Sequence, residues 1–166
     1  MSDAHVILIS VGTNIDRTYH TRQSRIALEA HFEQVTFSRV YESQAVGFDG
    51  KPFYNLVVRA VTDLSVEEVC QRLKQIEKDN GRVHTDKKFC SRTLDLDLLT
   101  YDDLVTQTPV ELPRGEILYN AFVLQPLAEL VPEAKHPVEK KSYATLWREF
   151  DASSQSLWPI AFEWSS

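Results

Sequence analysis

One helix can be located in this chain from its capping residues alone, and its position restricts the fold that the chain can adopt. Ser65 and Glu68 form a capping box, in which each side chain accepts a hydrogen bond from the other residue's exposed backbone N–H. Five side chains then follow at helical spacing on one face: Val66, Val69, Cys70, Leu73 and Ile76. Gly81 stands where a helix often ends in a left-handed residue. We therefore expect an amphipathic helix that ends near Gly81.

Segments rich in β-branched and aromatic residues lie on both sides of this helix and define the fold class. We expect strands at residues 6–11, 35–43, 53–62 and 93–101. A first helix is expected over residues 17–33, with Ile26, Ala27 and Ala30 on its inner face. The resulting order, strand–helix–strand–strand–helix–strand, is that of a ferredoxin-like α+β sandwich.

The remainder of the chain predicts a C-terminal extension rather than a second domain. We expect one domain over residues 1–166, with a core at about 6–132 and a C-terminal helix and tail at 133–166. The C-terminal helix is expected near residues 143–150. Three aromatic side chains are expected to pack on the body of the protein or on a partner chain: Trp158, Phe162 and Trp164.

Charge and composition argue against several classes of partner. The net charge of −6 argues against a nucleic-acid surface, because a phosphate backbone requires a basic stripe. No apolar run approaches the roughly 18 residues of a membrane span, and the residues before Val6 lead us to expect no targeting segment there. Cys70 and Cys90 lack metal or redox spacing and are interpreted as reduced thiols. We expect a cytoplasmic protein, monomeric or weakly dimeric, without nucleic-acid or membrane partners.

The stretch from Arg92 to Leu98 is the most informative for chemistry. Side chains alternate along a strand, so Asp95 and Asp97 should share one face while the leucines between them point into the core. Residues at this spacing lie about 7 Å apart at their Cα atoms, close enough for both carboxylates to bind hard cations such as Mg²⁺. Taken without Arg92, an Asp-x-Asp pattern is more typical of two solvent-facing acids on an edge strand, and the nearby arginine favours a metal pair that binds a polyphosphate.

Two further clusters could bind the organic and phosphate parts of a ligand. One consists of Glu77 and the loop from Arg82 to Arg92, and the basic side chains of this loop could neutralise a triphosphate, although a solvated polar loop has the same composition. Phe53, Asn55 and Phe122 could form a slot for a flat ring, or could simply pack in the core. A P-loop and the common zinc motifs are absent from the sequence.

The motifs described above, in their order along the chain, resemble those of the 6-hydroxymethyl-7,8-dihydropterin pyrophosphokinases of folate biosynthesis. The resemblance covers residues of about 6 to 132, and its most specific part is the intact Arg-Thr-Leu-Asp-Leu-Asp stretch. The matching elements are Gly12-Thr13-Asn14, Phe53-Tyr54-Asn55, Glu77 to Arg82, Arg92 to Leu98, and Phe122 to Leu127.

The resemblance implies an activity and a set of site residues. A pyrophosphoryl group would pass from ATP to the pterin alcohol, with two Mg²⁺ ions bridged by Asp95 and Asp97. The implied catalytic residues are Arg82, Arg92, Asp95 and Asp97. The implied ATP-binding residues are Glu77, Arg82, Arg92, Leu98 and Arg114. The pterin would stack between Phe53 and Phe122, hydrogen-bond to Asn55, and contact the backbone from Ser43 to Val46.

Several positions depart from the family's pattern and concentrate in the phosphate-binding part. Thr13 replaces a serine, Phe53 a tyrosine, His84 an arginine, Phe89 a tryptophan, Cys90-Ser91 a Gly-Pro pair, Arg114 a histidine, and Asn120 an arginine. The leading hypothesis is an authentic pyrophosphokinase. A paralogue that binds pterin or nucleotide with little turnover is the alternative, and a ferredoxin-like interaction module with incidental carboxylates is a third.

Overall fold

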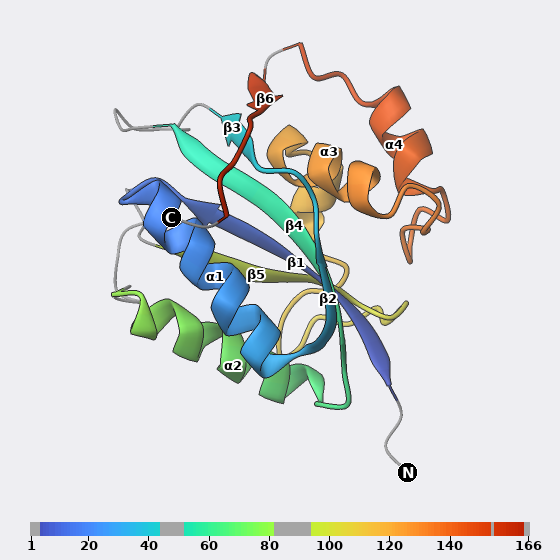
Figure 1. Cartoon of the computed structure of the whole chain (residues 1–166). Coiled ribbons are helices and arrows are strands. Elements are labelled where there is room, and N and C mark those ends of the chain that lie inside the picture. Colours follow the sequence, from blue (N-terminus) through green and yellow to red (C-terminus); the bar gives the residue numbers. More distant parts are fainter. Residues whose placement is uncertain (1–3, 44–51, 82–93, 154, 165–166) are drawn as a thin grey trace.

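Six strands form one sheet, and every strand pairs antiparallel with its neighbours (Figure 1). The computed structural model describes residues 4–43, 52–81, 94–153 and 155–164. Its elements are β1 (His5–Thr13), α1 (Arg17–His31), β2 (Glu33–Phe37), β3 (Tyr41–Ser43), β4 (Phe53–Thr62), α2 (Val66–Asp79), β5 (Asp95–Tyr101), a 3₁₀ turn η1 (Gly115–Leu118), α3 (Ala121–Leu130), α4 (Tyr143–Glu149) and β6 (Leu157–Pro159).

The strand order places β1 and β4 in the interior of the sheet. β1 lies between β5 and β4, and both β2 and β3 pair with the far edge of β4. β6 pairs with the free side of β3. The fold is therefore an α+β arrangement built on an antiparallel sheet, and three of the four predicted strand segments, at residues 6–11, 53–62 and 93–101, are found in it as β1, β4 and β5.

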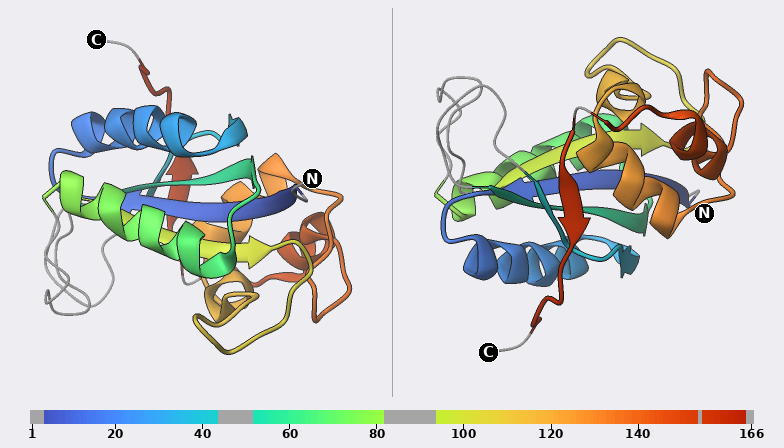
Figure 2. Two further views of the ribbon diagram at one scale, coloured as in Figure 1. Left: turned by 90° about the horizontal axis from the view of Figure 1, so that it is seen from below. Right: turned by 90° about the horizontal axis from the view of Figure 1, so that it is seen from above.

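Helices cover both faces of this sheet (Figure 2). On one face, α1 and α2 bury apolar side chains against β1, β4 and β5, with Ile9, Leu28 and Ile76 among the fully buried residues. On the other face, α3 packs over Leu8, Val57 and Leu99, and α4 packs against α3. Each face thus has its own hydrophobic core.

The helix predicted from its capping box is confirmed as α2. Ser65 N–H donates to Glu68 Oε1 at 3.1 Å, and Glu68 N–H donates to Ser65 Oγ at 3.2 Å. Gly81 follows the helix with φ of 84°, a left-handed conformation that glycine adopts without strain. The residues between the caps bury Val69, Leu73 and Ile76 as the helical spacing predicts.

The single strand predicted over residues 35–43 is wrong, because the chain forms two strands there. Ser38 separates β2 from β3, and its Oγ accepts a hydrogen bond from Val57 N–H at 3.0 Å. The Ser38 N–H donates to Val57 O at 2.9 Å. One of the two hydrogen bonds between these residues thus comes from a side chain, which interrupts the regular ladder and divides the strand.

The predicted inner face of α1 is also wrong in part. Ile26 is 60% exposed and Ala30 is exposed, whereas Ala27 is partly buried against the core. The buried residues of this helix are mostly polar: His20, Thr21, Ser24 and Leu28. His20 Nδ1 lies 2.9 Å from Asn80 Oδ1, and Ser24 Oγ donates to Thr21 O at 2.6 Å. Hydrogen bonds within the fold therefore accommodate His20 and Ser24 on the buried side, whereas the hydrophobicity pattern points to the opposite side of the helix.

The C-terminal extension contributes to both the core and the sheet. α4 confirms the helix expected near residues 143–150. Two of the three tail aromatics pack on the body: Phe162 lies 5.9 Å from the Tyr54 ring centroid, and Trp164 lies 5.6 Å from that of Phe37. Among the described residues, no helix combines the length and the hydrophobicity required to cross a membrane.

Candidate active site

Three residues of adjacent strands lie in one row at the same end of the sheet. Gly12 of β1 pairs with Asn55 of β4 on one side and with Asp95 of β5 on the other. A Cβ atom at Gly12 would lie 3.3 Å from Asn55 Oδ1 and 3.8 Å from Phe53 Cδ1. The absence of a side chain at Gly12 therefore leaves room for Asn55 and Phe53 beside the carboxylate of the neighbouring strand.

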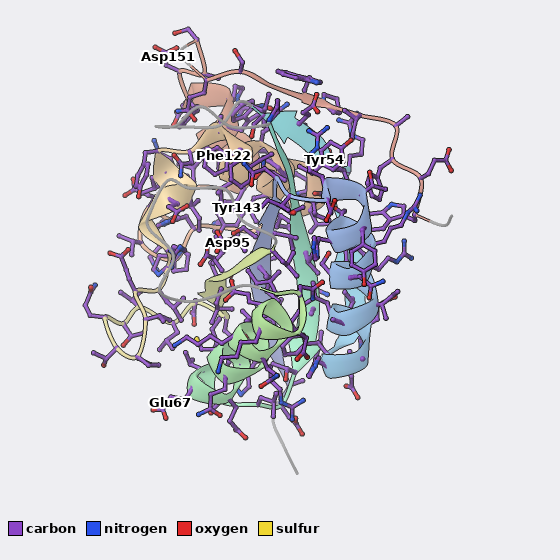
Figure 3. All side chains as sticks on the ribbon, turned by 90° about the vertical axis from the view of Figure 1, so that its left-hand side faces the viewer. Tyr54, Glu67, Asp95, Phe122, Tyr143 and Asp151 are labelled. Carbon is purple, nitrogen blue, oxygen red and sulfur yellow. The ribbon has the colours of Figure 1, made fainter. Side chains whose placement is uncertain are left out.

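The alternation predicted for β5 is confirmed. Leu94, Leu96 and Leu98 are 0–5% exposed and belong to the core under α1 and α2. Asp95 and Asp97 alternate with them and are half-buried on the opposite face, which is the face where Leu99 packs under α3. Figure 3 labels Asp95 and, in α3, Phe122. Because Leu98 points into the core, any nucleotide contact at this position is left to its backbone.

Glu77 holds the start of β5 in place. This residue is 4% exposed near the C-terminal end of α2, and its Oε2 accepts a hydrogen bond from Leu96 N–H at 2.8 Å. The contact joins α2 to the backbone between the two aspartates. Glu77 thus lies close to the carboxylate pair, and it has a structural role there that the sequence pattern does not reveal.

Arg114 brings positive charge to the carboxylate pair. Its Nη2 lies 3.5 Å from Asp97 Oδ1, and its Nε donates to Glu116 Oε1 at 3.1 Å. The Arg114 backbone N–H donates to Leu99 O at 2.9 Å, which fixes this segment along the edge of β5. Asn120 Nδ2 donates to the other Glu116 oxygen at 3.2 Å. Glu116 therefore links the two positions, Arg114 and Asn120, at which the sequence departs from the family's pattern.

The environment of Asp97 disfavours the charged form of its carboxyl. Burial is the main cause, and the nearby Asp95 carboxylate adds to it, so that the pKa of Asp97 rises from 3.8 to about 7. The Arg114 guanidinium opposes this rise, whereas Glu116 and Glu77 add to it more weakly. A bound cation would remove the repulsion between the two aspartates, so this donor set fits a hard divalent ion.

We expect the stability of the ligand-free protein to fall as the pH rises from about 4 to about 7. In this window the folded state keeps a proton on Asp97 that the unfolded chain has already released, so raising the pH favours unfolding. The expected loss of unfolding free energy is about 2–4 kcal/mol. Urea unfolding at pH 5 and pH 8 measures it. Asp97→Asn is the control, since it should lose this component of the pH dependence, and an equal dependence in both proteins would contradict the assignment.

A buried amide and two aromatic rings lie on the same face as the aspartates. Asn55 Nδ2 donates to Ser43 Oγ at 2.6 Å, and both side chains are about 95% buried, at 6% and 5% exposure. Phe53 and Phe122 are partly buried, and Phe122 lies in the first turn of α3 against the core of this face (Figure 3). The predicted slot residues are thus brought to one face, and Ser43 contacts Asn55 through its side chain.

Some predicted site residues lie outside the described part of the chain, and two residues of the site were not predicted. Arg82, Arg92 and Val46 fall in the undescribed segments, as do the departures at His84 and Phe89. Glu116 and the spacing role of Gly12 were missed. Glu116 stands two residues after Arg114 and four before Asn120, a helical-turn spacing that would have suggested the link.

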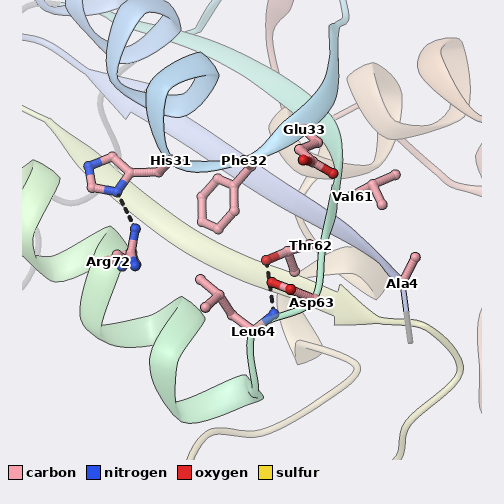
Figure 4. A pocket seen from close by; sticks show the side chains of 9 residues that line it. All are labelled: Ala4, His31, Phe32, Glu33, Val61, Thr62, Asp63, Leu64 and Arg72. Carbon is pink, nitrogen blue, oxygen red and sulfur yellow. Dashed lines mark hydrogen bonds between the residues drawn. The ribbon is translucent and has the colours of Figure 1, made fainter. Parts of the chain in front are cut away.

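A separate cavity lies at the opposite end of the sheet. It has a volume of about 340 Å³ and is lined by residues that include Phe32, Val61 and Arg72 (Figure 4). None of the predicted site residues lines it. Within the described ranges, no group of three or more His, Cys, Asp or Glu side chains could by itself enclose a metal ion. A hard cation at Asp95 and Asp97 would bind further oxygen ligands in addition to these two carboxylates.

Fold and site together define an α+β protein with a paired-carboxylate site beside a buried amide, at one end of an antiparallel sheet. The model of the 7,8-dihydro-6-hydroxymethylpterin-pyrophosphokinase family matches residues 8–132. The chain belongs to this family.

Named relatives and solved structures agree with this assignment. A 2-amino-4-hydroxy-6-hydroxymethyldihydropteridine pyrophosphokinase from Synechocystis is 34% identical over 161 residues, which covers 95% of this chain and 81% of the relative. Its counterpart from Aquifex aeolicus is 33% identical, over 81% of this chain and 86% of the relative. The crystal structure of wild-type Plasmodium falciparum HPPK-DHPS with pteroate matches with a TM-score of 0.71 at 13% identity. That match covers 90% of this chain but 43% of the longer one, and it supports the fold alone.

Proposed function

We propose that this protein transfers a pyrophosphoryl group from ATP to 6-hydroxymethyl-7,8-dihydropterin, which yields the pterin diphosphate and AMP in folate biosynthesis. The observation that carries the proposal is the row formed by Asp95, Gly12 and Asn55. It places a carboxylate pair and a buried amide side by side on one sheet face, as needed to hold a triphosphate next to a flat heterocycle. Relatives that carry the pyrophosphokinase name support the same reaction.

The reaction divides naturally between the two halves of this site. The pterin hydroxymethyl oxygen would attack the β-phosphorus of ATP, the bond to the α,β-bridging oxygen would break, and the hydroxyl proton would be released. Asp95 and Asp97 would hold two Mg²⁺ ions, which supply positive charge to the phosphate oxygens. Arg114 lies next to Asp97 and is placed to neutralise further phosphate charge. Arg82 and Arg92 are proposed to assist from the loop between α2 and β5.

The pterin half would rely on ring stacking and on one buried amide. Phe53 and Phe122 are proposed to stack on the pterin, with Asn55 bonding its polar edge and the segment from Ser43 to Val46 lining the pocket. The hydrogen bond from Asn55 to Ser43 supports this assignment, because it orients the amide so that its carbonyl oxygen can accept from the ligand.

The finer architectural and cellular assignments follow from the same reasoning. We propose a ferredoxin-like arrangement in a single domain, supported by the strand order β5-β1-β4 with β2 and β3 outside β4, and by the pairing of β6 with the same sheet. A cytoplasmic location and a monomer or weak homodimer, without nucleic-acid or membrane partners, complete the proposal. Its acidic net charge of −6 supports the absence of nucleic-acid binding.

AMP release provides the direct test of the proposed function. The purified protein should form AMP from ATP only when both Mg²⁺ and hydroxymethyl-dihydropterin are present. Chelation of Mg²⁺ should stop the reaction. Pterin binding measured by calorimetry without any AMP formation would favour the alternative, a binding paralogue with little turnover. Failure to bind pterin or nucleotide would refute both.

Replacing Asn55 with alanine should weaken binding of a pterin analogue by roughly 1–3 kcal/mol, since a buried hydrogen-bonding group in a desolvated site is lost. Isothermal titration calorimetry measures the change. Asn120→Ala removes an equal amide on the Arg114 side of the site and should leave the pterin affinity unchanged. An unaltered affinity in Asn55→Ala would reassign this residue to packing.

A further inference from the structure

Glu42 of β3 directly precedes Ser43, and its carboxylate accepts hydrogen bonds from side chains of two other elements. Arg17 Nη1 donates to Glu42 Oε2 at 2.6 Å, and Trp158 Nε1 donates to Glu42 Oε1 at 3.1 Å. Arg17 begins α1, whereas Trp158 lies in β6 of the C-terminal tail. Both carboxylate oxygens are thus occupied by donors from elements far apart in the sequence. The Arg17 and Glu42 side chains are 25% and 21% exposed, so their ion pair is largely shielded from water.

Arg17 also contacts the strand that faces Glu42 across the sheet. Its guanidinium carbon lies 4.1 Å from the centroid of the Tyr54 ring, and its Nη1 donates to Pro52 O at 3.0 Å. Tyr54 pairs with Glu42 in the register between β4 and β3. One arginine therefore ties together the end of β3 and the beginning of β4.

These contacts lie behind the residues proposed to bind the pterin. Successive side chains of a strand point to opposite faces, so Glu42 and Tyr54 face α1 while Ser43, Phe53 and Asn55 face the site. On the face of the site, the hydrogen bond between Ser43 and Asn55 joins the same two strands, β3 and β4. Fixing β3 against β4 from behind therefore fixes the position of Ser43 relative to Asn55.

The tail that carries Trp158 is itself anchored. β6 pairs with β3 over three residues, with Trp158 opposite Glu42. Beyond the strand, Arg22 Nε donates to Glu163 O at 2.7 Å, and Phe162 packs edge-on against the Tyr54 ring. In Figure 1 this segment runs from β6 along the sheet edge toward α1. β3 has only three residues, and its pairing with β6 adds a second neighbouring strand to the one that β4 provides.

We infer that Arg17, Glu42 and Trp158 are positioning residues for pterin binding, through which the C-terminal tail sets the affinity of a pocket that it does not line. The inference rests on the proposed function, because it assumes that the Ser43–Asn55 pair binds the pterin. The tail acts by holding β3 in register with β4. Nucleotide binding, which belongs to the face of β5 and to Arg114, is independent of these contacts.

Trp158→Phe tests the inference with little change in shape, since it removes the N–H donor to Glu42 and keeps an aromatic ring. We expect the KM for hydroxymethyl-dihydropterin to rise about three- to tenfold, with kcat and the KM for ATP unchanged. The equilibrium affinity for a pterin analogue, measured by calorimetry, should fall by the same factor. Trp164→Phe is the matched control for the loss of ring size in the tail, because it makes the same substitution six residues further along and keeps an aromatic ring against Phe37, Phe162 and Arg25.

Glu42→Gln and a pair of Arg17 variants extend the test. Glu42→Gln should also raise the pterin KM selectively, and Arg17→Lys should bind the pterin analogue more tightly than Arg17→Met, because it retains the charge opposite Glu42. Urea unfolding of each variant separates a change in affinity from a loss of folded protein. Pterin affinities of Trp158→Phe and Glu42→Gln equal to that of the wild type would overturn the inference. So would an equal loss in Trp164→Phe.

The behaviour of the unmodified protein distinguishes failure of the positioning role from failure of the proposed function. If the wild type forms AMP and the variants behave identically to it, the positioning role is wrong and the proposed function stands. If the wild type neither binds pterin nor forms AMP, the proposed function fails and this inference fails with it.

Discussion

Replacing Asp97 with asparagine is expected to lower AMP-forming turnover by about 10²–10³-fold while the protein remains folded. The substitution keeps the shape of the side chain and removes the negative charge that would bind Mg²⁺. Burial and Asp95 hold the pKa of the Asp97 carboxyl at about 7, so at pH values above 7 the folded wild type carries an unfavourable buried charge. The variant lacks this charge, and its urea unfolding midpoint at these pH values should therefore be higher than that of the wild type. Lower activity combined with higher stability is a signature that general unfolding cannot produce.

Steady-state kinetics at saturating ATP, Mg²⁺ and pterin measure the loss. Asp103→Asn is the matched control, since Asp103 is exposed in the turn just after β5 and should tolerate the change. Turnover of Asp97→Asn near that of the wild type would show that the carboxylate pair does not bind the catalytic metal.

Replacing Arg114 with alanine is expected to reduce turnover by about 10²-fold. Two effects combine: the site loses a guanidinium placed 3.5 Å from Asp97, and the pKa of Asp97 rises further once that opposing charge is gone. Arg114→Lys should retain part of the activity, because a lysine keeps the charge but cannot contact phosphate through two N–H groups at once. Arg148→Ala, on the exposed surface of α4, is the control.

A variant at Asn120 tests whether Arg114 replaces the positive charge that the family carries at position 120. Asn120 and Arg114 both bond to Glu116, so an arginine at position 120 would bring a second guanidinium to the same carboxylate. Asn120→Arg should raise turnover or leave it unchanged, and it should partly rescue Arg114→Ala. If Arg114→Ala turned over like the wild type, Arg114 would not replace the charge absent at Asn120, and the binding-paralogue alternative would gain support.

The parts of the fold that were predicted correctly are those governed by local signals. The capping box located α2, and the alternation of leucine with aspartate located β5 and its two faces. The inner face of α1 was wrong because buried His20 and Ser24 satisfy their polar groups within the fold, which a hydrophobicity pattern does not register.

Elements that depend on distant parts of the chain were not predicted. α3 contains Pro126, which reads as a helix breaker, yet packing against Leu8 and Val57 retains the helix. β6 has three residues and exists only through its pairing with β3. In the site, the carboxylate face was predicted from spacing, whereas the linking role of Glu116 and the room left by Gly12 depend on how separate segments meet.

The pairing of β6 with β3 has a consequence for how the protein is made. Trp158 and Glu42 are separated by 116 residues, so this contact has one of the longest sequence separations among the hydrogen bonds of the described chain. Contacts of this kind form slowly and late, because a long loop must close first. During synthesis on the ribosome, β3 would have no outer partner until residues 157–159 had emerged from the exit tunnel. The contact between Trp158 and Glu42 behind the proposed pterin pocket would therefore form only after β1 to β5 had been synthesised.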